Sequence, residues 1–210
     1  MQTAFSGKEI QVLSVENKIY ILMNKPAGYV CKAVADRNKT VFELLPAELQ
    51  VLVQGAKRGE RLHTVGRLDR DTTGLLLITN DGQFSHKLTA PEYSVSKQYQ
   101  VTLETPVKLE EQKGYCARAA DGILLAADKK APEERAGAAG IKFLDKETAT
   151  VNCVITVTEG KFHEVRRIFS ALGNKVLKLK RIQMGALELG TELPEGSWRY
   201  LTEQELSRLM

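Results

Sequence analysis

The chain has 210 residues, of which 43% are hydrophobic, 27% charged and 6% aromatic, and its formal net charge is +4. This length and composition suit one large or two small globular domains, and no apolar run approaches the roughly 20 residues that a membrane span needs. The N-terminus lacks the apolar stretch of a secretory signal. The 3 cysteines are far apart, which suits a reducing compartment. We therefore expect a cytoplasmic protein without membrane contact.

The first half of the chain predicts short strands and helices separated by turn signals. Apolar and alternating patterns predict strands over 19–23, 63–68, 75–79 and 97–103. Helical spacing predicts two short helices over 40–53, divided at Pro46, and another over 83–89, before Pro91.

The second half continues in the same manner. Helices are predicted over 109–119, 163–173 and 203–209, strands over 150–158 and 175–180, and a flexible loop over 128–139. Strands and short helices without a steady βαβ alternation indicate an α+β fold. We expect a mixed, largely antiparallel sheet flanked by short helices.

Positive charge is concentrated in one segment, from Lys161 to Arg181. It holds one acid, Glu164, and seven basic residues: Lys161, Arg166, Arg167, Lys175, Lys178, Lys180 and Arg181. A basic stripe on a nearly neutral body is typical of a protein that binds a polyanion. A solvated charged face would have the same composition.

The predicted helix over 163–173 is amphipathic. One face carries the apolar residues Val165, Ile168, Phe169 and Leu172, and the opposite face gathers the polar residues His163, Arg166, Arg167, Ser170 and Asn174. Arg166 and Arg167 are expected to project outward near the first turn, where the helix dipole disfavours cations. A bound carboxylate or phosphate would offset that cost. Alternatively, both side chains extend into solvent.

A dense polar loop from Gly66 to Gly74 joins two apolar strands and carries Asp69 between Arg67 and Arg70. The flanking guanidinium groups favour the ionised carboxylate, and loops that follow strand ends often carry chemistry. The alternative is a structural role for Asp69, as the acceptor in an Asx-turn.

The segment Gly66-Arg67-Leu68-Asp69-Arg70-Asp71-Thr72-Thr73-Gly74-Leu75-Leu76-Leu77 resembles the signature of the ribosomal pseudouridine synthases of the RsuA/RluB/RluE/RluF type. Three further segments resemble the other motifs of that family, in the family's order: Asn24-Lys25-Pro26-Ala27-Gly28-Tyr29-Val30-Cys31, Lys97-Gln98-Tyr99 and Glu159-Gly160-Lys161-Phe162-His163-Glu164-Val165-Arg166-Arg167-Ile168-Phe169. The resemblance covers the chain from about Ile19 to its end. It implies the pseudouridine synthase fold.

The resemblance also implies roles for particular residues. Asp69 would be the catalytic aspartate, Tyr99 the aromatic residue that stacks on the target base, and Arg166 the basic partner of Asp69. Either Leu177 or Leu179 would form the apolar wall of the base pocket. Other side chains are candidates for binding RNA: Arg67, Arg70, Lys97, His163, Arg167, Lys178, Lys180 and Arg181.

The reaction of this family needs no redox step and no net hydrolysis, so we expect neither a cofactor nor a metal. The histidines, His63, His86 and His163, are scattered without metal-ligand spacing. The target uridine must leave its stack to reach a pocket, and base stacking and phosphate contacts can offset that cost. Asp69 could attack C1′ or C6 of the nucleoside, or take the C2′ proton. The sequence does not decide among these routes.

The Gly-Tyr-Val-Cys segment ending at Cys31 and the Thr72-Thr73-Gly74 triplet resemble the small-subunit branch of the family. The expected partner is therefore 16S rRNA in a ribosome-assembly intermediate, bound by a monomer. The alternatives are a 23S rRNA pseudouridine synthase and a non-catalytic RNA-binding assembly factor. A glycoside hydrolase using Asp69 and Asp71 is disfavoured, because adjacent loop acids rarely face one substrate.

Relatives of this type carry an RNA-binding module of the S4 kind before the catalytic domain. Too few residues precede Ile19 for such a module. We therefore expect residues 1–18 to be an N-terminal extension and residues 19–210 to be the catalytic domain. The sequence leaves open whether the chain is naturally short or part of a longer protein.

Overall fold

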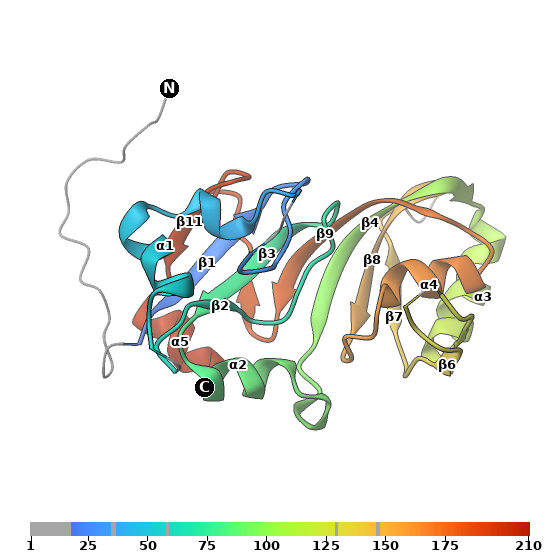
Figure 1. Ribbon diagram of the computed structural model, residues 1–210. Helices are drawn as coiled ribbons and strands as arrows, with labels where there is room; N and C mark the ends of the chain where they lie inside the picture. Colours follow the sequence, from blue (N-terminus) through green and yellow to red (C-terminus); the bar gives the residue numbers. More distant parts are fainter. Residues whose placement is uncertain (1–17, 35–36, 58, 129, 146–147) are drawn as a thin grey trace.

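A computed structural model describes residues 18–34, 37–57, 59–128, 130–145 and 148–210 (Figure 1). Of the predicted N-terminal extension, residues 1–17 lie outside the described residues. The molecule is built on one long, twisted sheet that runs through its whole width, with short helices packed against it (Figure 1).

The main sheet has nine strands: β1 (Tyr20–Lys25), β2 (His63–Thr64), β3 (Thr73–Thr79), β4 (Lys97–Val107), β7 (Gly140–Phe143), β8 (Thr150–Val157), β9 (Val176–Met184), β10 (Leu187–Glu188) and β11 (Trp198–Tyr200). Their order is β11-β1-β3-β9-β4-β8-β7, with β2 added to β3 and β10 to β9. All pairings are antiparallel except the one between β3 and β9. A separate pair joins β5 (Leu124–Leu125) and β6 (Glu134–Arg135). The predicted mixed, largely antiparallel sheet is therefore confirmed.

The helices are short, as the sequence predicts: η1 (Val41–Leu44), α1 (Ala47–Gln54), α2 (Gly82–Thr89), η2 (Pro91–Tyr93), α3 (Leu109–Ala120), α4 (Glu164–Ala171) and α5 (Glu203–Leu209). Pro46 separates η1 from α1 because it lacks an N–H and cannot continue a helix. Asp81 begins α2 by accepting hydrogen bonds from the first-turn amides of Gln83 and Phe84.

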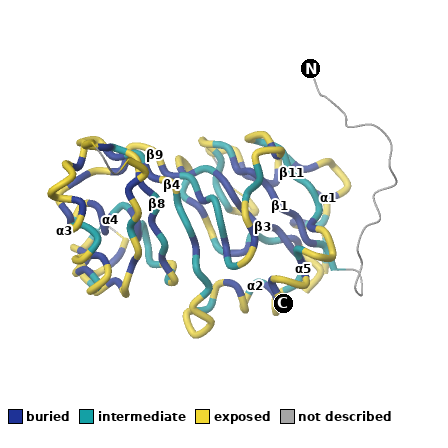
Figure 2. The backbone as a smooth tube through the Cα atoms, turned by 180° about the vertical axis from the view of Figure 1, so that it is seen from behind, coloured by how far each residue is buried: buried dark blue, intermediate teal, exposed yellow. Residues whose placement is uncertain are grey.

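The core is divided between the two halves of the sheet. Residues of β4, β8 and β9 form one buried cluster together with the apolar face of α4, and it includes Val101, Ile155 and Phe169. Strands β1 and β3 separate two further clusters, because their alternate side chains point to opposite faces: Leu75 and Leu77 to one, Leu76 and Ile78 to the other. Figure 2 shows these central strands as the most buried part of the chain.

The two halves meet where β3 begins to pair with β9. Only two pairs form there, Thr73 with Lys180 and Gly74 with Arg181. Gly74 has φ +99, and a Cβ at this position would overlap the Arg181 carbonyl oxygen and lie 2.9 Å from its nitrogen. Glycine is needed for both the conformation and the close approach. This contact fixes the end of the Asp69 loop against β9.

Two expectations about local structure need correction. The predicted strand over 63–68 is only two residues long, because the chain leaves the sheet after Thr64 and turns at Gly66, which has φ +68. The segment over 128–139 is not a flexible loop: it contains β6, and Ala131, Ala136 and Ala139 are buried. A high content of small alanine residues is typical of a loop, but here these side chains are buried.

Candidate active site

Lys25 holds the Asp69 loop in place. Its side chain is fully buried at the end of β1, and Nζ donates to the carbonyl oxygens of Pro26 at 3.0 Å, Arg70 at 3.2 Å and Thr72 at 2.8 Å. The Gly28 amide donates to the same Arg70 carbonyl at 2.7 Å. Burial lowers the pKa of the Lys25 ammonium. The loop is therefore anchored by its backbone, which leaves the Asp69 side chain free for other contacts.

A small pocket gathers the residues that the sequence predicts to be catalytic. Its volume is about 90 Å³, and Asp69, Tyr99, Arg166 and Leu179 all line it. They come from the loop before β3, from β4, from α4 and from β9. Four elements distant in sequence thus place a carboxylate, a phenol, a guanidinium group and an aliphatic wall around one space.

Arg166 connects the two acids of the loop. Its Nε lies 3.9 Å from Asp69 Oδ2, whereas Nη2 donates to Asp71 Oδ2 at 3.0 Å and Nη1 to the Val176 carbonyl at 3.1 Å. The predicted pairing with Asp69 is present, but the shorter ion pair is with Asp71, which the sequence interpretation treated as unrelated to the site. The Asp69 side chain is 35% exposed, so solvent reaches the carboxylate.

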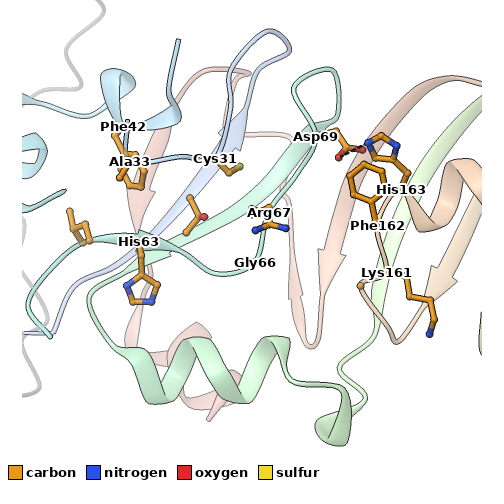
Figure 3. Close-up of a pocket in the computed structure, with 13 residues that line it drawn as sticks. Cys31, Ala33, Phe42, His63, Gly66, Arg67, Asp69, Lys161, Phe162 and His163 are labelled. Atoms are coloured by element: carbon orange, nitrogen blue, oxygen red, sulfur yellow. Dashed lines mark ion pairs between the residues drawn. The ribbon is translucent and has the colours of Figure 1, made fainter. Parts of the chain in front are cut away.

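His163 contacts the other oxygen of Asp69. His163 Nε2 lies 3.5 Å from Asp69 Oδ1, and Nδ1 lies 3.2 Å from Asp128 Oδ2. The Phe162 ring stacks on the imidazole, with centroids 3.8 Å apart and planes 25° apart. Figure 3 shows the imidazole facing Asp69 with Phe162 beside it. Asp69 is therefore flanked by Arg166 on one oxygen and by His163 on the other.

A larger cavity of about 460 Å³ adjoins the small pocket. Both are lined by Arg67, Asp69, Gly160, Lys161 and His163, so Asp69 lies on the border between them. The larger cavity extends past Cys31 to Phe42 at the far side (Figure 3). Together the two spaces can hold more than a single base.

Two buried polar groups complete the wall of the small pocket. The Thr72 hydroxyl is buried and has no hydrogen-bond partner within the described part of the chain. Glu164 is 7% exposed, and burial, with the Glu159 carboxylate as the next cause, raises its pKa to about 7. The pocket therefore offers an unsatisfied hydroxyl and a carboxyl group that gains or loses its proton near neutral pH.

Arg167 does not project outward, and the prediction that it binds RNA is wrong. Its side chain is 7% exposed and forms an ion pair with Glu134 at 2.7 Å. It also donates to four carbonyl oxygens, of Leu125, Ala126, Pro132 and Phe162. The helical wheel placed this side of α4 in solvent. In the structure the segment around β5 and β6 packs over it, and the carbonyl oxygens of that segment accept hydrogen bonds from Arg167.

Lys97 and Arg181 are also buried, which contradicts their predicted contact with RNA. Lys97 is 7% exposed, and Nζ donates to the Val95 carbonyl at 2.8 Å and the Thr158 carbonyl at 3.3 Å. Arg181 is 2% exposed, and Nε donates to the Leu75 carbonyl at 2.7 Å. The Lys97 ammonium group and the Arg181 guanidinium group thus donate hydrogen bonds to backbone carbonyl oxygens where strands end or meet.

The remaining candidates divide between two faces of the sheet. Arg67 and Arg70 are exposed on the Asp69 loop, and Arg67 lines both spaces around Asp69. Lys178 and Lys180 are paired with Thr102 and Gln100, whose side chains alternate with those of Tyr99 and Val101 along β4. The side chains of Lys178 and Lys180 therefore lie on the face of the sheet opposite to that of Tyr99.

Those two lysines line a second groove, of about 410 Å³, which Asp71 and Leu179 also line. Leu177 lines this groove, is 52% exposed, and does not line the small pocket. Of the two leucines that the sequence left open, Leu179 is therefore the one that lines the small pocket.

The sequence interpretation missed four residues of the site: Lys25, Asp71, Phe162 and Asp128. Lys25 lies within the first family motif. Its position at the end of an apolar strand could have indicated that its side chain is buried. Asp128 gave no signal, because its segment has the composition of a loop. Among the described residues, no group of three or more His, Cys, Asp or Glu side chains could hold a metal ion, and no helix in that part of the chain is long and apolar enough to cross a membrane.

The fold and this pocket define a class of RNA-modifying enzyme. Residues 19–171 match the family model of RNA pseudouridylate synthase. The chain therefore belongs to the RNA pseudouridylate synthase family, whose members are isomerases that convert uridine in RNA to pseudouridine.

Curated relatives point to one branch of the family. The chain is 38% identical over 196 residues to ribosomal small subunit pseudouridine synthase A of Haemophilus influenzae, which covers 93% of this chain and 75% of that protein. It is 36% identical over 191 residues to the protein of the same name from Escherichia coli, covering 91% and 74%. These relatives agree with the branch that the sequence motifs resemble.

Solved structures agree with the fold. A crystal structure described as a pseudouridylate synthase has a TM-score of 0.78 and 39% sequence identity, and the match covers 92% of this chain and 74% of that one. A structure of an H/ACA RNP bound to a substrate RNA containing 2′-deoxyuridine has a TM-score of 0.57 at 18% identity. The second likeness supports the fold alone.

Proposed function

We propose that this enzyme isomerises a specific uridine of small-subunit (16S) ribosomal RNA to pseudouridine, with Asp69 as the catalytic residue. The observation that carries the proposal is the placement of Asp69 in one pocket with Tyr99, Arg166 and Leu179. Relatives of 36–38% identity that are named ribosomal small subunit pseudouridine synthase A support the choice of RNA.

In this proposal the flipped uracil enters the small pocket and lies between the Tyr99 ring and Leu179. Stacking on an aromatic ring offsets the few kcal/mol that unstacking costs. The Asp69 carboxylate then faces the ribose and acts in its ionised form, by attack at C1′ or C6 or by taking the C2′ proton. Arg166 faces one oxygen of that carboxylate, with its Nε 3.9 Å from Oδ2.

The detached uracil must turn without leaving, so the pocket must hold it in more than one orientation. The apolar Leu179 and the Tyr99 face allow rotation, since stacking has no fixed hydrogen-bond register. Tyr99 is the candidate for moving the C5 proton.

The RNA would approach over Arg67 and Arg70, which are exposed on the Asp69 loop. The larger cavity has room for nucleotides that flank the target. We further propose that the substrate is rRNA in a ribosome-assembly intermediate in the cytoplasm, that the enzyme acts as a monomer, and that residues 19–210 form its catalytic domain.

The catalytic assignment is tested by Asp69→Asn, which keeps the shape of the side chain and removes its charge. We expect no release of tritium from C5-labelled RNA, while the dissociation constant for RNA stays within about threefold, because the variant loses a reacting group and keeps the phosphate contacts. The matched control is Asp121→Asn at the end of α3, outside both cavities. Turnover by Asp69→Asn would refute the assignment.

The choice of RNA is tested by mapping pseudouridines in cells that lack the protein. Carbodiimide treatment and primer extension should show one missing stop in 16S rRNA, restored by the wild-type gene and not by Asp69→Asn. A missing stop in 23S rRNA would identify a large-subunit enzyme. An unchanged pattern together with altered ribosome assembly would indicate a binding factor instead.

A further inference from the structure

His163 occupies an unusual position for a residue that only binds RNA. It is the residue before α4 and has φ +49, one of two left-handed residues other than glycine among those described. Such a conformation is uncommon for residues other than glycine, although histidine adopts it more often than most, and it persists where the surroundings determine it. Here its backbone carbonyl accepts the first bond of α4, from the Arg167 amide at 2.9 Å. The backbone is thus set so that the imidazole projects back toward Asp69.

The imidazole is held on three sides. Asp128 lies 3.2 Å from Nδ1, Asp69 lies 3.5 Å from Nε2, and Phe162 covers one ring face at a centroid distance of 3.8 Å. The side chain is 34% exposed. A histidine whose two ring nitrogens each face a carboxylate has a defined orientation, and Figure 3 shows that orientation on the Asp69 side.

The two contacts of the imidazole place different demands on its ring nitrogens. An ionised carboxylate only accepts hydrogen bonds, so the Nδ1 beside Asp128 must donate. A neutral ring then presents its Nε2 lone pair to Asp69 Oδ1, and two acceptors repel each other. The contact is attractive only when a proton lies between Nε2 and Oδ1. At 3.5 Å it is long for a hydrogen bond, and such contacts often shorten when substrate binds.

We propose that His163 is a positioning residue for Asp69, oriented by Asp128, and that the proton between Nε2 and Asp69 Oδ1 fixes the second oxygen of the carboxylate while Arg166 faces the first. This inference rests on the proposed function. It assigns to His163 and Asp128 a role in the rate of reaction, whereas the sequence motifs predicted only RNA binding for His163 and no role for Asp128.

The test uses His163→Asn, because asparagine tolerates the left-handed conformation and its shorter amide cannot reach both carboxylates. We expect kcat in the tritium-release assay to fall about tenfold or more, while KM and the dissociation constant for RNA stay within about threefold. The control is His86→Asn, on α2, whose side chain is 65% exposed and pairs with Glu92.

Asp128→Ala tests the same chain of contacts from outside α4. Because Asp128 acts through His163, Asp128→Ala should lower kcat. The double variant Asp128→Ala/His163→Asn should have a kcat within about twofold of that of His163→Asn alone. A kcat unchanged in His163→Asn, a loss found only in KM, or additive losses in the double variant would each overturn the inference. The proposed function fails separately, if Asp69→Asn turns over.

Discussion

At the scale of single residues, Glu164 is the most unusual ionisable group of the site. It begins α4, is 7% exposed and lines the pocket that contains Asp69. Its pKa is raised to about 7, chiefly by burial and next by Glu159, with which it shares a hydrogen bond. The folded protein therefore binds a proton at Glu164 more tightly than the unfolded chain does.

This proton affinity predicts how stability changes with pH. The contribution of Glu164 is fully present below the pKa of an unfolded glutamate, about 4.3, and is lost as pH rises through about 7. Glu164→Gln keeps a donor toward Glu159 and cannot ionise. It should therefore raise the free energy of unfolding at pH 8 by about 1–3 kcal/mol, and change it little at pH 5.

Thermal unfolding at the two pH values measures this difference. The expected rise in Tm at pH 8 is about 3–8 °C for a chain of this size. The control is Glu110→Gln, an exposed acid in the first turn of α3. A Tm difference that is equal at pH 5 and pH 8 would contradict the assignment of a buried, proton-binding Glu164.

The same scale shows what could be predicted from sequence. Asp69, Tyr99 and Arg166 were placed in one pocket, because each stands in a motif whose residues can be matched one by one. Arg167, one position further, was misplaced. Its neighbours around β5 and β6 lie more than thirty residues earlier in the chain, and a helical wheel contains no information about what covers each face.

At the scale of elements, the join between β3 and β9 determines the position of the Asp69 loop. The strands pair in parallel over two residues, and Gly74 permits the contact. The sequence predicted both strands but not their pairing. Parallel neighbours far apart in the chain leave no local signal, whereas apolar periodicity reveals a buried strand directly.

Gly74→Ala should therefore damage the site by moving an element. The added methyl group meets the Arg181 backbone, and alanine is strained at φ +99. We expect a loss of about 2–5 kcal/mol in the free energy of unfolding from strain and overlap together. Urea denaturation followed by circular dichroism measures it.

The matched control is Gly114→Ala in the interior of α3, where a new Cβ meets nothing within 4 Å. That change should stabilise the protein by up to about 1 kcal/mol, because alanine favours the helix. A Gly74→Ala protein as stable as wild type would mean that β3 and β9 can separate at no cost.

At the scale of the whole molecule, the sheet has one face that carries the proposed site and an opposite face. Asp69, Tyr99 and Arg166 share one pocket, whereas Lys178 and Lys180 line a groove with Gln100 and Thr102 on the other side. The basic stripe of the sequence is therefore not one surface. Part of it is buried, and part faces away from the target base.

RNA affinity should follow this division. Arg67→Ala should reduce the magnitude of the slope of log K against log salt by about 0.7–0.9, the value for one lost phosphate contact. The double variant Lys178→Ala/Lys180→Ala should leave the slope unchanged, because these lysines pair with Thr102 and Gln100, whose side chains point away from the face of Tyr99. A shallower slope in the double variant would show that the RNA wraps around the sheet.

The meeting of β3 with β9 also sets the order of events during synthesis. Asp69 emerges from the ribosome early, but Arg166, Leu179 and the strand that receives Gly74 follow about a hundred residues later. A nascent chain folds from its N-terminal end, yet this one cannot assemble its pocket until β9 has been released. The enzyme should thus remain inactive toward RNA until β9 has left the ribosome and paired with β3.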